Sequence, residues 1–195
     1  MRVAAVVLAA GGSTRFGKPK QFARFRGETF VGRIVKAAIE AGCDPIVVVT
    51  GADSAQIELG LKGLAIRIAM NPNWPTGLAS SIRVGLGNAM EGAADLGAAL
   101  LVTCDQPFVD GAVITQLIQL HSTSGKPIAA SAYAGTLGIP VLFDRSCFPD
   151  LLQLNGDNGA KKIIVGRPHD VVSLDFPAGK IDIDTVADYE KLDRM

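Results

Sequence analysis

The chain has 195 residues, of which 48% are hydrophobic and 19% are charged, and its 19 Lys and Arg balance its 19 Asp and Glu. This composition excludes an intrinsically disordered chain, which would be poor in apolar residues and rich in charge. The balanced charge argues against a nucleic-acid-binding protein, because neutralising phosphates requires a surplus of Lys and Arg. We expect one domain over residues 1–195, without a linker or an internal repeat.

The net charge of zero conceals an uneven distribution. Residues 1–36 hold eight Lys and Arg and one acid, Glu28, which gives +7, whereas the remaining 11 Lys and Arg and 18 acids give −7. Such a basic segment indicates either an anion site or a solvated helix face. On charge alone both interpretations stay open.

Cysteine usage and the N-terminal segment favour a reducing, cytoplasmic setting. Cys43, Cys104 and Cys147 lie far apart and form no C-x-x-C pair, so their spacing predicts neither a disulfide framework nor a zinc site. The apolar residues 3–10 superficially resemble a signal peptide, but a buried first strand fits better. No run approaches the roughly 20 apolar residues of a transmembrane helix, so we expect no membrane partner.

Short apolar runs alternate with segments of helical spacing along the chain. The runs lie at residues 3–9, 45–50, 65–70, 98–103 and 128–132. Their continuous apolarity predicts strands that are covered on both faces. Apolar residues recur at helical spacing over residues 30–41, 78–90 and 113–120. The alternation predicts an α/β domain with a mostly parallel sheet.

The loop after the first predicted strand has the composition of an anion-binding loop. Its small residues let backbone N–H groups approach an oxyanion or a base edge closely. They are Ala9, Ala10, Gly11 and Gly12, directly after Leu8. Arg15, Lys18 and Lys20 follow and can supply hydrogen-bond donors and positive charge. A polyphosphate is the natural ligand of such a loop.

A phosphate-binding P-loop is an alternative for the same segment. Residues 12–18 match G-x-x-x-x-G-K, but Pro19 stands where Ser or Thr should hold Mg²⁺, and it has no N–H. No G-x-G-x-x-G follows the first strand, which disfavours a dinucleotide site. A glycine-rich turn with solvated basic residues explains Arg15 and the nearby lysines poorly.

Two later loops offer further anion contacts. Residues 71–83 form a loop that opens onto a helix, where Ser80 and Ser81, with the N-terminal backbone donors, can receive an anion or a base. N-capping by Thr76 is the simpler role for this segment and is compatible with the first. A second turn runs into a helix and offers another contact for an anion or a substrate. Its candidate residues are Gly156, Asp157 and Lys161.

Carboxylates follow a predicted buried strand and recur near the C-terminus. Asp105 stands where open α/β sheets place their ligands, and its oxygens suit Mg²⁺ bridged to phosphates, although Asp also caps loops of this kind. Asp182 and Asp184 alternate with isoleucines and therefore share one face. They repel each other unless a cation or a proton lies between them. Capping of the next helix by Asp184 is the alternative.

The two histidines, His121 and His169, lie in no catalytic pattern. A His-dependent triad or a zinc hydrolase is therefore not expected.

Six segments occur in the order of a known family. They are LAAGGSTRFGKPKQ, NPNWPTGLASSIRVGL, LLVTCDQP, GIPVLF, LNGDNGAKK and DIDTVADY. With them the chain resembles the MobA-like nucleotidyltransferases, in particular the molybdenum cofactor cytidylyltransferase branch. The resemblance implies a three-layer, Rossmann-like (GT-A-like) fold, a nucleoside triphosphate on the first loop and Mg²⁺ on the Asp of CDQP. It also implies that Ala10 marks a preference for CTP.

The implied reaction transfers CMP from CTP to the terminal phosphate of molybdopterin, or of the molybdenum cofactor, and releases pyrophosphate. Arg15, Lys20 and Asp105 are the implied catalytic residues, and Asp182 or Asp184 completes the metal site. Nucleotide contacts are implied for Leu8, Ala9, Ala10, Gly11, Gly12, Lys20, Ser80 and Ser81. Acceptor contacts are implied for Gly156, Asp157 and Lys161. A molybdoenzyme or a cofactor chaperone is a candidate protein partner.

Two departures from the family pattern concern the acceptor end. Val186 and Ala187 replace the Pro and Glu of D-T-P-E-D, and Lys161 replaces an Arg, so a point charge replaces a bidentate clamp. Alternatives are a transferase that uses GTP or another phosphorylated acceptor, a P-loop-like NTPase, and a carrier that binds the pterin without consuming CTP.

Overall fold

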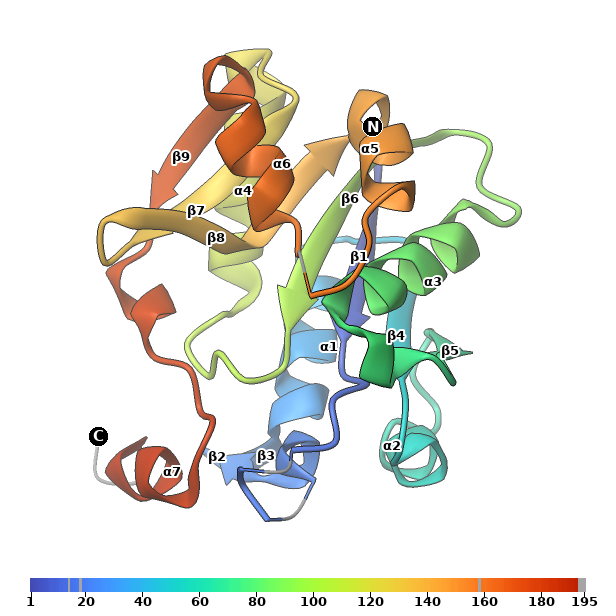
Figure 1. Cartoon of the computed structure of the whole chain (residues 1–195), viewed down its shortest axis with the longest axis vertical. Coiled ribbons are helices and arrows are strands. Elements are labelled where there is room, and N and C mark those ends of the chain that lie inside the picture. The colour runs from blue at the N-terminus through green and yellow to red at the C-terminus, as the bar shows by residue number, and fades with distance from the viewer. Residues whose placement is uncertain (14, 18, 158, 193–195) are drawn as a thin grey trace.

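A seven-stranded sheet runs through the middle of the computed structural model (Figure 1), which describes residues 1–13, 15–17, 19–157 and 159–192. Its order is β5-β4-β1-β6-β8-β7-β9. The strands are β1 (Arg2–Leu8), β4 (Ile46–Thr50), β5 (Arg67–Met70), β6 (Leu96–Thr103), β7 (Ile128–Tyr133), β8 (Thr136–Asp144) and β9 (Val171–Asp175). Within this sheet β8 alone runs antiparallel to its neighbours. The predicted α/β fold with a mostly parallel sheet is confirmed.

Helices cover both faces of the sheet and complete the three layers. On one face lie α1 (Phe30–Glu40), α2 (Ser54–Gly60), α4 (Gly111–Ser124) and α7 (Val186–Leu192). On the other lie α3 (Leu78–Met90), α5 (Phe148–Leu152) and α6 (Lys161–Gly166). Strand β1 contributes to the cores on both faces of the sheet. Its residues Val3, Ala5 and Val7 belong to the core under α1 and α4, and the residues between them belong to the core under α3, which is why the strand is apolar without a break.

The sequence predicted the five most apolar strands with ends within two residues of those observed, but it did not predict β8 and β9. Gly138 and Pro140 interrupt the apolar pattern of β8, and a strand containing Pro is a weak signal. Shorter elements include the hairpin of β2 (Arg24–Phe25) and β3 (Glu28–Thr29) and the 3-10 turns η1 (Lys20–Phe22), η2 (Trp74–Thr76) and η5 (Pro177–Lys180).

The N-termini of α1, α4 and α3 are capped in different ways. Thr29 caps α1 by accepting from Gly32 N at 3.1 Å, and Asp110 caps α4 by accepting from Val113 N at 2.9 Å. The suggested cap of α3 by Thr76 is wrong, because that hydroxyl donates to Asn73 O instead and the N-cap is Gly77. Gly77 has φ +111°, a conformation that favours glycine.

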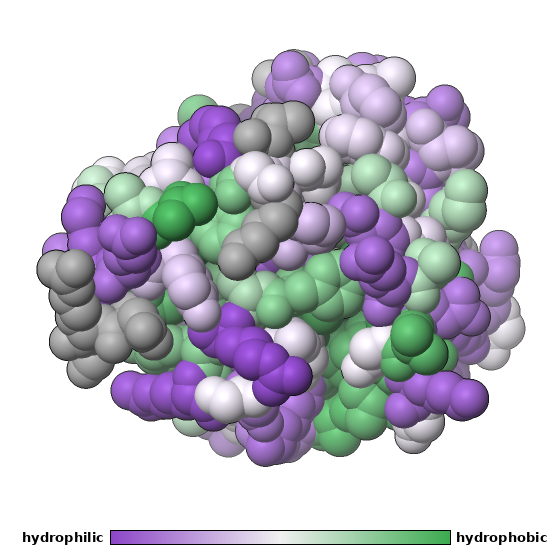
Figure 2. Space-filling model, turned by 90° about the horizontal axis from the view of Figure 1, so that it is seen from below, coloured by the Kyte–Doolittle hydropathy of each residue, from purple (hydrophilic) through white to green (hydrophobic). Residues whose placement is uncertain are grey.

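Loops gather at the edge where β1 and β6 end, at the bottom of Figure 1. Figure 2 shows this edge from below, with apolar side chains in the centre and hydrophilic side chains around them. The carboxyl ends of parallel strands are where open α/β sheets bind ligands. Within the described ranges, no helix is both long and apolar enough to span a bilayer.

Two glycines of α3 test how tightly this helix packs on the sheet. A β-carbon at Gly85 would lie 2.7 Å from Cγ2 of Val49 and still closer to Val6, whereas one at Gly87 would meet nothing within 4 Å. We therefore expect Gly85→Ala to lower the free energy of unfolding by about 1–3 kcal/mol through overpacking. Gly87→Ala should raise it by up to about 1 kcal/mol through helix propensity.

Urea unfolding followed by circular dichroism measures both variants. Equal stability of the two alanine variants would contradict the close approach of α3 to β1 and β4.

Candidate functional site

The first loop is held in shape by one buried amide. Gln21 is 2% exposed, and its Nε2 donates to Ala9 O at 2.9 Å and to Gly11 O at 2.8 Å. Its Oε1 accepts from Ser13 Oγ at 3.3 Å, and the same hydroxyl accepts from Lys20 N at 3.0 Å. The two ends of the loop are therefore tied together through the Gln21 side chain.

The accessible part of this loop is its glycine backbone. Leu8, Ala9 and Ala10 are buried, whereas Gly11 is exposed. Gly12 lies under the indole of Trp74, since a β-carbon there would be 2.9 Å from the ring. Position 12 thus requires glycine for packing against Trp74 as well as for access to the backbone. The contacts of residues 8–12 with a nucleotide stay a prediction.

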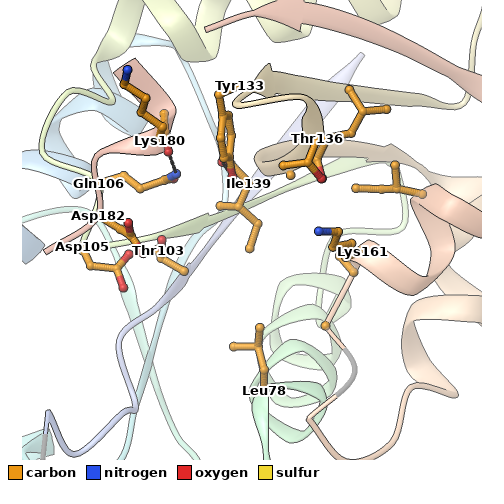
Figure 3. A pocket seen from close by; sticks show the side chains of 16 residues that line it. Leu78, Thr103, Asp105, Gln106, Tyr133, Thr136, Ile139, Lys161, Lys180 and Asp182 are labelled. Atoms are coloured by element: carbon orange, nitrogen blue, oxygen red, sulfur yellow. Dashed lines mark hydrogen bonds between the residues drawn. The ribbon is translucent and has the colours of Figure 1, made fainter. Parts of the chain in front are cut away.

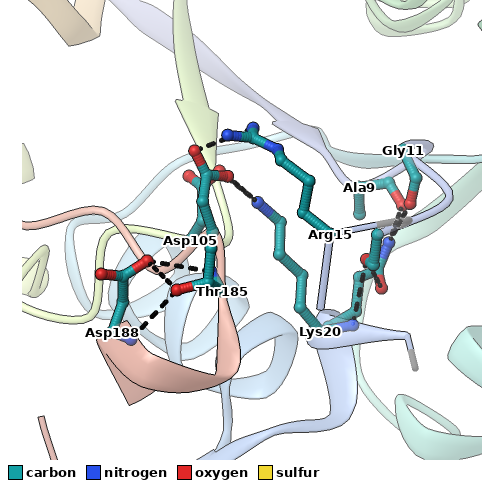
Figure 4. Close-up of polar contacts among 10 residues, drawn as sticks. Ala9, Gly11, Arg15, Lys20, Asp105, Thr185 and Asp188 are labelled. Carbon is teal, nitrogen blue, oxygen red and sulfur yellow. Dashed lines mark hydrogen bonds and ion pairs between the residues drawn. The ribbon is translucent and has the colours of Figure 1, made fainter. Parts of the chain in front are cut away.

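A cluster of two cations and two carboxylates lies beside the loop (Figure 4). The Lys20 ammonium donates to Asp105 Oδ2 at 2.9 Å and to Asp184 Oδ1 at 3.0 Å. Arg15 Nη2 donates to Asp184 Oδ2 at 2.9 Å. The basic N-terminal segment and the acidic remainder of the chain therefore meet at one place.

The charges in this cluster stabilise one another. Burial disfavours the charge on Lys20, but Asp105 and Asp184 outweigh it and hold the pKa of the ammonium above its usual value. Burial likewise opposes the charge on Asp184, and Lys20 and Arg15 nevertheless lower the pKa of that carboxyl. The Lys20 side chain is 16% exposed and that of Arg15 is 70% exposed. Lys20 is the fixed cation of the pair, and Arg15 reaches out from the rim.

The expected alternation of residues 181–184 is seen only in part. Ile183 is 1% exposed and Asp182 is exposed, but Ile181 and Asp184 are half-buried and the segment is not a strand. Burial and the neighbouring Asp184 and Asp105 raise the pKa of the Asp182 carboxyl. Asp182 lines the cavity described below, whereas Asp184 turns to Lys20 and Arg15.

The alternative role of Asp184 as a helix cap is wrong. Thr185 caps α7, because Asp188 N donates to Thr185 Oγ1 at 3.2 Å. In return, Thr185 N donates to Asp188 Oδ2 at 2.9 Å, as in a capping box. This reciprocal pair leaves the Asp184 carboxylate available for the cluster.

Backbone contacts fix the C-terminal segment against the end of β6. Ile183 N donates to Asp105 O at 2.9 Å, and Gln106 Nε2 donates to Gly179 O at 2.8 Å. The edge of the Tyr189 ring of α7 also packs on Phe16 of the first loop, with ring centroids 5.9 Å apart. The three segments of the cluster are thus positioned independently of their charges.

A cavity of about 430 Å³ opens beside the cluster (Figure 3). Asp105, Gln106 and Asp182 form one wall, and Lys161 lies across from them. Apolar side chains form much of the remaining lining. They include Leu78, Tyr133, Leu137, Ile139 and Ile164.

The other predicted contacts lie apart from this wall. Gly156 and Asp157 pack at the start of α3, where Ala79 N donates to Gly156 O at 3.2 Å. Ser80 and Ser81 are each 4% exposed. Their hydroxyls accept from Asn71 Nδ2 at 2.9 and 3.0 Å. The structure does not bring these residues to Lys20, and their ligand contacts stay predictions.

Four residues that shape the site carry no functional signal in the sequence: Gln21, Trp74, Gln106 and Tyr133. Gln21 and Gln106 stand within quoted motifs, but nothing in the sequence indicates that either amide is buried. Lys18, a candidate cation, lies outside the described residues. The three cysteines are free, as expected, and burial raises the pKa of the Cys104 thiol to about 12, which leaves it a poor nucleophile.

A divalent cation fits only with help from a ligand. Among the described residues, no three His, Cys, Asp or Glu side chains are grouped closely enough to hold a metal. Asp105 and Asp184 nevertheless share one cation, the Lys20 ammonium. Two carboxylates with phosphate oxygens form the kind of donor set that Mg²⁺ prefers. The residues present therefore fit such an ion when a phosphate supplies further oxygens.

The buried amide that holds the first loop yields a prediction. Gln21→Met leaves the carbonyls of Ala9 and Gly11 without their donor, so we expect the free energy of unfolding to fall by about 1–3 kcal/mol. Gln56→Met, at an exposed position on α2, serves as the matched control and should change it by less than about 0.5 kcal/mol. Urea titration measures both, and equal stabilities would show that Gln21 does not support the loop.

Comparison with known proteins places this site in a family. A family model described as the MobA-like NTP transferase domain matches residues 5–171. Nicotine blue oxidoreductase of Paenarthrobacter nicotinovorans is 27% identical over 97% of this chain and 96% of its own. The purine catabolism protein PucB of Bacillus subtilis is 27% identical over 97% of this chain and 95% of its own.

Solved structures agree with the family match. Rv0371c of Mycobacterium tuberculosis has a TM-score of 0.85 and 29% identity, and the match covers 100% of this chain and 99% of that one. Its complex with manganese has a TM-score of 0.78 and 28% identity at the same coverage. The family match includes the first loop, the CDQP segment and most of the sheet, and we conclude that the chain belongs to the MobA-like NTP transferase family.

Proposed function

We propose that the protein is a Mg²⁺-dependent nucleotidyltransferase that transfers CMP from CTP to the terminal phosphate of molybdopterin, or of the molybdenum cofactor, and releases pyrophosphate. The observation that carries the proposal is the cluster of Lys20, Arg15, Asp105 and Asp184 beside a glycine loop at the carboxyl edge of the sheet. Such a cluster offers cations for a triphosphate and carboxylates for its metal ion.

The cations neutralise charge that builds up during transfer. A phosphate oxygen of the acceptor attacks the α-phosphorus of CTP in line, and the bond to the β-phosphate bridging oxygen breaks. Lys20, held by two carboxylates, stabilises the triphosphate, and the more exposed Arg15 follows the departing pyrophosphate. The reaction requires no covalent intermediate on the enzyme, and catalysis consists of positioning and charge neutralisation.

Asp105, together with Asp184 or Asp182, is the proposed ligand set for the metal. When bound, Mg²⁺ supplies positive charge at the α-phosphate and at the leaving group. Asp105 and Asp184 already converge on one ammonium, and Asp182 lies on the cavity side. The manganese complex of Rv0371c supports a divalent cation in a protein of this fold.

The cavity is the proposed acceptor site. Its apolar walls suit a ring system, and Lys161 offers a positive charge for a phosphate. Among the described residues, Lys161 has no hydrogen-bond or ion-pair partner that would compete for this role. Gly156 and Asp157, in the turn before α6, are proposed to contact the same substrate.

Location and protein partners follow from the same proposal. Three buried, free cysteines suit a reducing cytoplasm. A molybdoenzyme or a cofactor chaperone is the proposed recipient of the product.

Product analysis distinguishes this proposal from its rivals. A P-loop-like NTPase would release inorganic phosphate from CTP, and a carrier would bind the pterin without consuming any nucleotide. A transferase for another acceptor would release pyrophosphate without molybdopterin when that acceptor is supplied. Assays with CTP, GTP, ATP and UTP, with and without molybdopterin and Mg²⁺, separate these cases.

Removing one carboxylate tests the metal assignment. We expect Asp105→Asn, and likewise Asp105→Ala, to lower pyrophosphate release by about 100-fold or more, because the charge that holds the cation is lost. Circular dichroism should show an intact fold. Glu58→Gln, an exposed carboxylate on α2, makes the same chemical change elsewhere and should retain activity. Full activity of the Asp105 variants would refute the assignment.

The base preference is tested at Ala10. Ala10 is 5% exposed and belongs to the core on the α3 face of the sheet, so the removal of its methyl group leaves space beside the loop. We expect Ala10→Gly to lower the ratio of kcat/KM for CTP to that for GTP by about tenfold, the scale of one methylene in a pocket. Ala9→Gly, in the core on the opposite face, is the control and should leave the ratio unchanged.

A further inference from the structure

We propose that Gln106 determines which acceptor the enzyme accepts, by offering its buried side-chain oxygen to an N–H donor on the ring of the acceptor. The inference rests on the proposed function in one respect, namely that the acceptor occupies the cavity beside Asp105.

The first observation is that the Gln106 side chain is buried and fixed. Gln106, which follows Asp105 in the sequence, is 7% exposed and lines the cavity. Nε2 donates to Gly179 O at 2.8 Å (Figure 3). Because the nitrogen must face that carbonyl, the orientation of the amide is set, and Oε1 is the remaining group.

The second observation is that Gln106 Oε1 accepts no hydrogen bond within the described part of the protein. Among the described residues it has no hydrogen-bond partner. Buried side-chain oxygens are paired in the large majority of cases, so an unpaired one at the wall of a cavity indicates a contact supplied by a ligand. The Gln106 amide also lies near the Tyr133 hydroxyl, where it favours the charged form and so works against the rise that burial causes in the pKa of the phenol, but that hydroxyl donates its one proton to Ile139 O at 3.0 Å and leaves none for Oε1.

The surroundings of Oε1 select the kind of ligand group. Asp105 and Asp182 lie on the same wall, so this side of the cavity presents acceptors and attracts donors. A phosphate would be repelled here and attracted to Lys161 on the far side. Apolar side chains of β8 and α3, Ile139 and Leu78 among them, line the space between. The matching ligand is a ring with N–H donors at one end and an anionic group at the other.

Gly179 is required for this arrangement. Its carbonyl anchors Gln106, and a β-carbon at this position would lie 2.6 Å from Cδ1 of Tyr133. The absence of a side chain thus lets the aromatic ring and the amide lie side by side at the cavity wall.

A site built to accept from an N–H donor rejects an analogue without that donor, because the oxygen then stays unpaired. The probes are pterin, its 3-methyl derivative, which lacks the ring-amide N–H, and its 2-dimethylamino derivative, which lacks the amine N–H. We expect the wild-type protein to bind pterin about tenfold more tightly than at least one of the two derivatives, as measured by the intrinsic fluorescence of the pterin.

The variants identify the group responsible. Gln106→Met keeps the length of the side chain but lacks the oxygen, and its preference for pterin should fall to within about twofold. Gln116→Met, at an exposed position on α4, is the matched control and should keep the wild-type preference. If thermal unfolding shows that Gln106→Met does not fold, Gln106→Lys, which keeps a donor for Gly179 O but has no acceptor oxygen, takes its place, and its preference for pterin should likewise fall to within about twofold.

Two results overturn the inference: equal binding of all three probes by the wild type, or an undiminished preference in folded Gln106→Met. An undiminished preference in folded Gln106→Lys also overturns it. Pyrophosphate release from CTP with molybdopterin is measured separately. Turnover without discrimination among the probes refutes the role of Gln106 alone, whereas discrimination without CTP turnover refutes the proposed transfer alone.

Discussion

The ammonium of Lys20 is the interaction on which the functional edge of the sheet depends. It joins carboxylates that lie 85 and 164 residues away along the chain, and both are only partly exposed. Two such carboxylates side by side would repel each other without a cation between them. Backbone and aromatic contacts bring the first loop, the end of β6 and the segment before α7 together, and the charge of Lys20 offsets the repulsion between the two carboxylates where they meet.

The charged cluster and the cavity share a wall, so they cannot vary independently. Asp105 belongs to both. The backbone N–H of Ile183 donates to the carbonyl of Asp105, and the side-chain amide of Gln106 donates to the carbonyl of Gly179, earlier in the same C-terminal segment. These two hydrogen bonds align the C-terminal segment with the end of β6 and set where Asp182 and Asp184 lie. The same contacts that order the backbone thus divide the two carboxylates, one toward the cavity and one toward Lys20.

The sequence predicted what depends on local pattern. Continuous apolar runs located five strands. The split of charge indicated an anion site or a solvated helix face, and it did not predict that Arg15 and Lys20 would pair with Asp184 and Asp105. It could not predict contacts whose partner is a distant backbone atom. The amides of Gln21 and Gln106 bind carbonyls, which every residue carries, so neither side chain was marked as structural. The role of Thr76 was equally hard to predict, because its hydroxyl donates to Asn73 O and does not cap α3.

Strand β8, which the sequence did not predict, explains why the two ends of the candidate site differ. The end proposed to bind the nucleotide is held by several contacts, those of Gln21 within the loop and of two carboxylates on Lys20. The end proposed to bind the acceptor is bounded by β8, which runs antiparallel beside β6 and brings Leu137 and Ile139 to the cavity. Its polar groups, Lys161 and the Gln106 oxygen, have no partner among the described residues. An acceptor bound as proposed would have to pair with them, so its identity depends on the cavity wall rather than on the first loop.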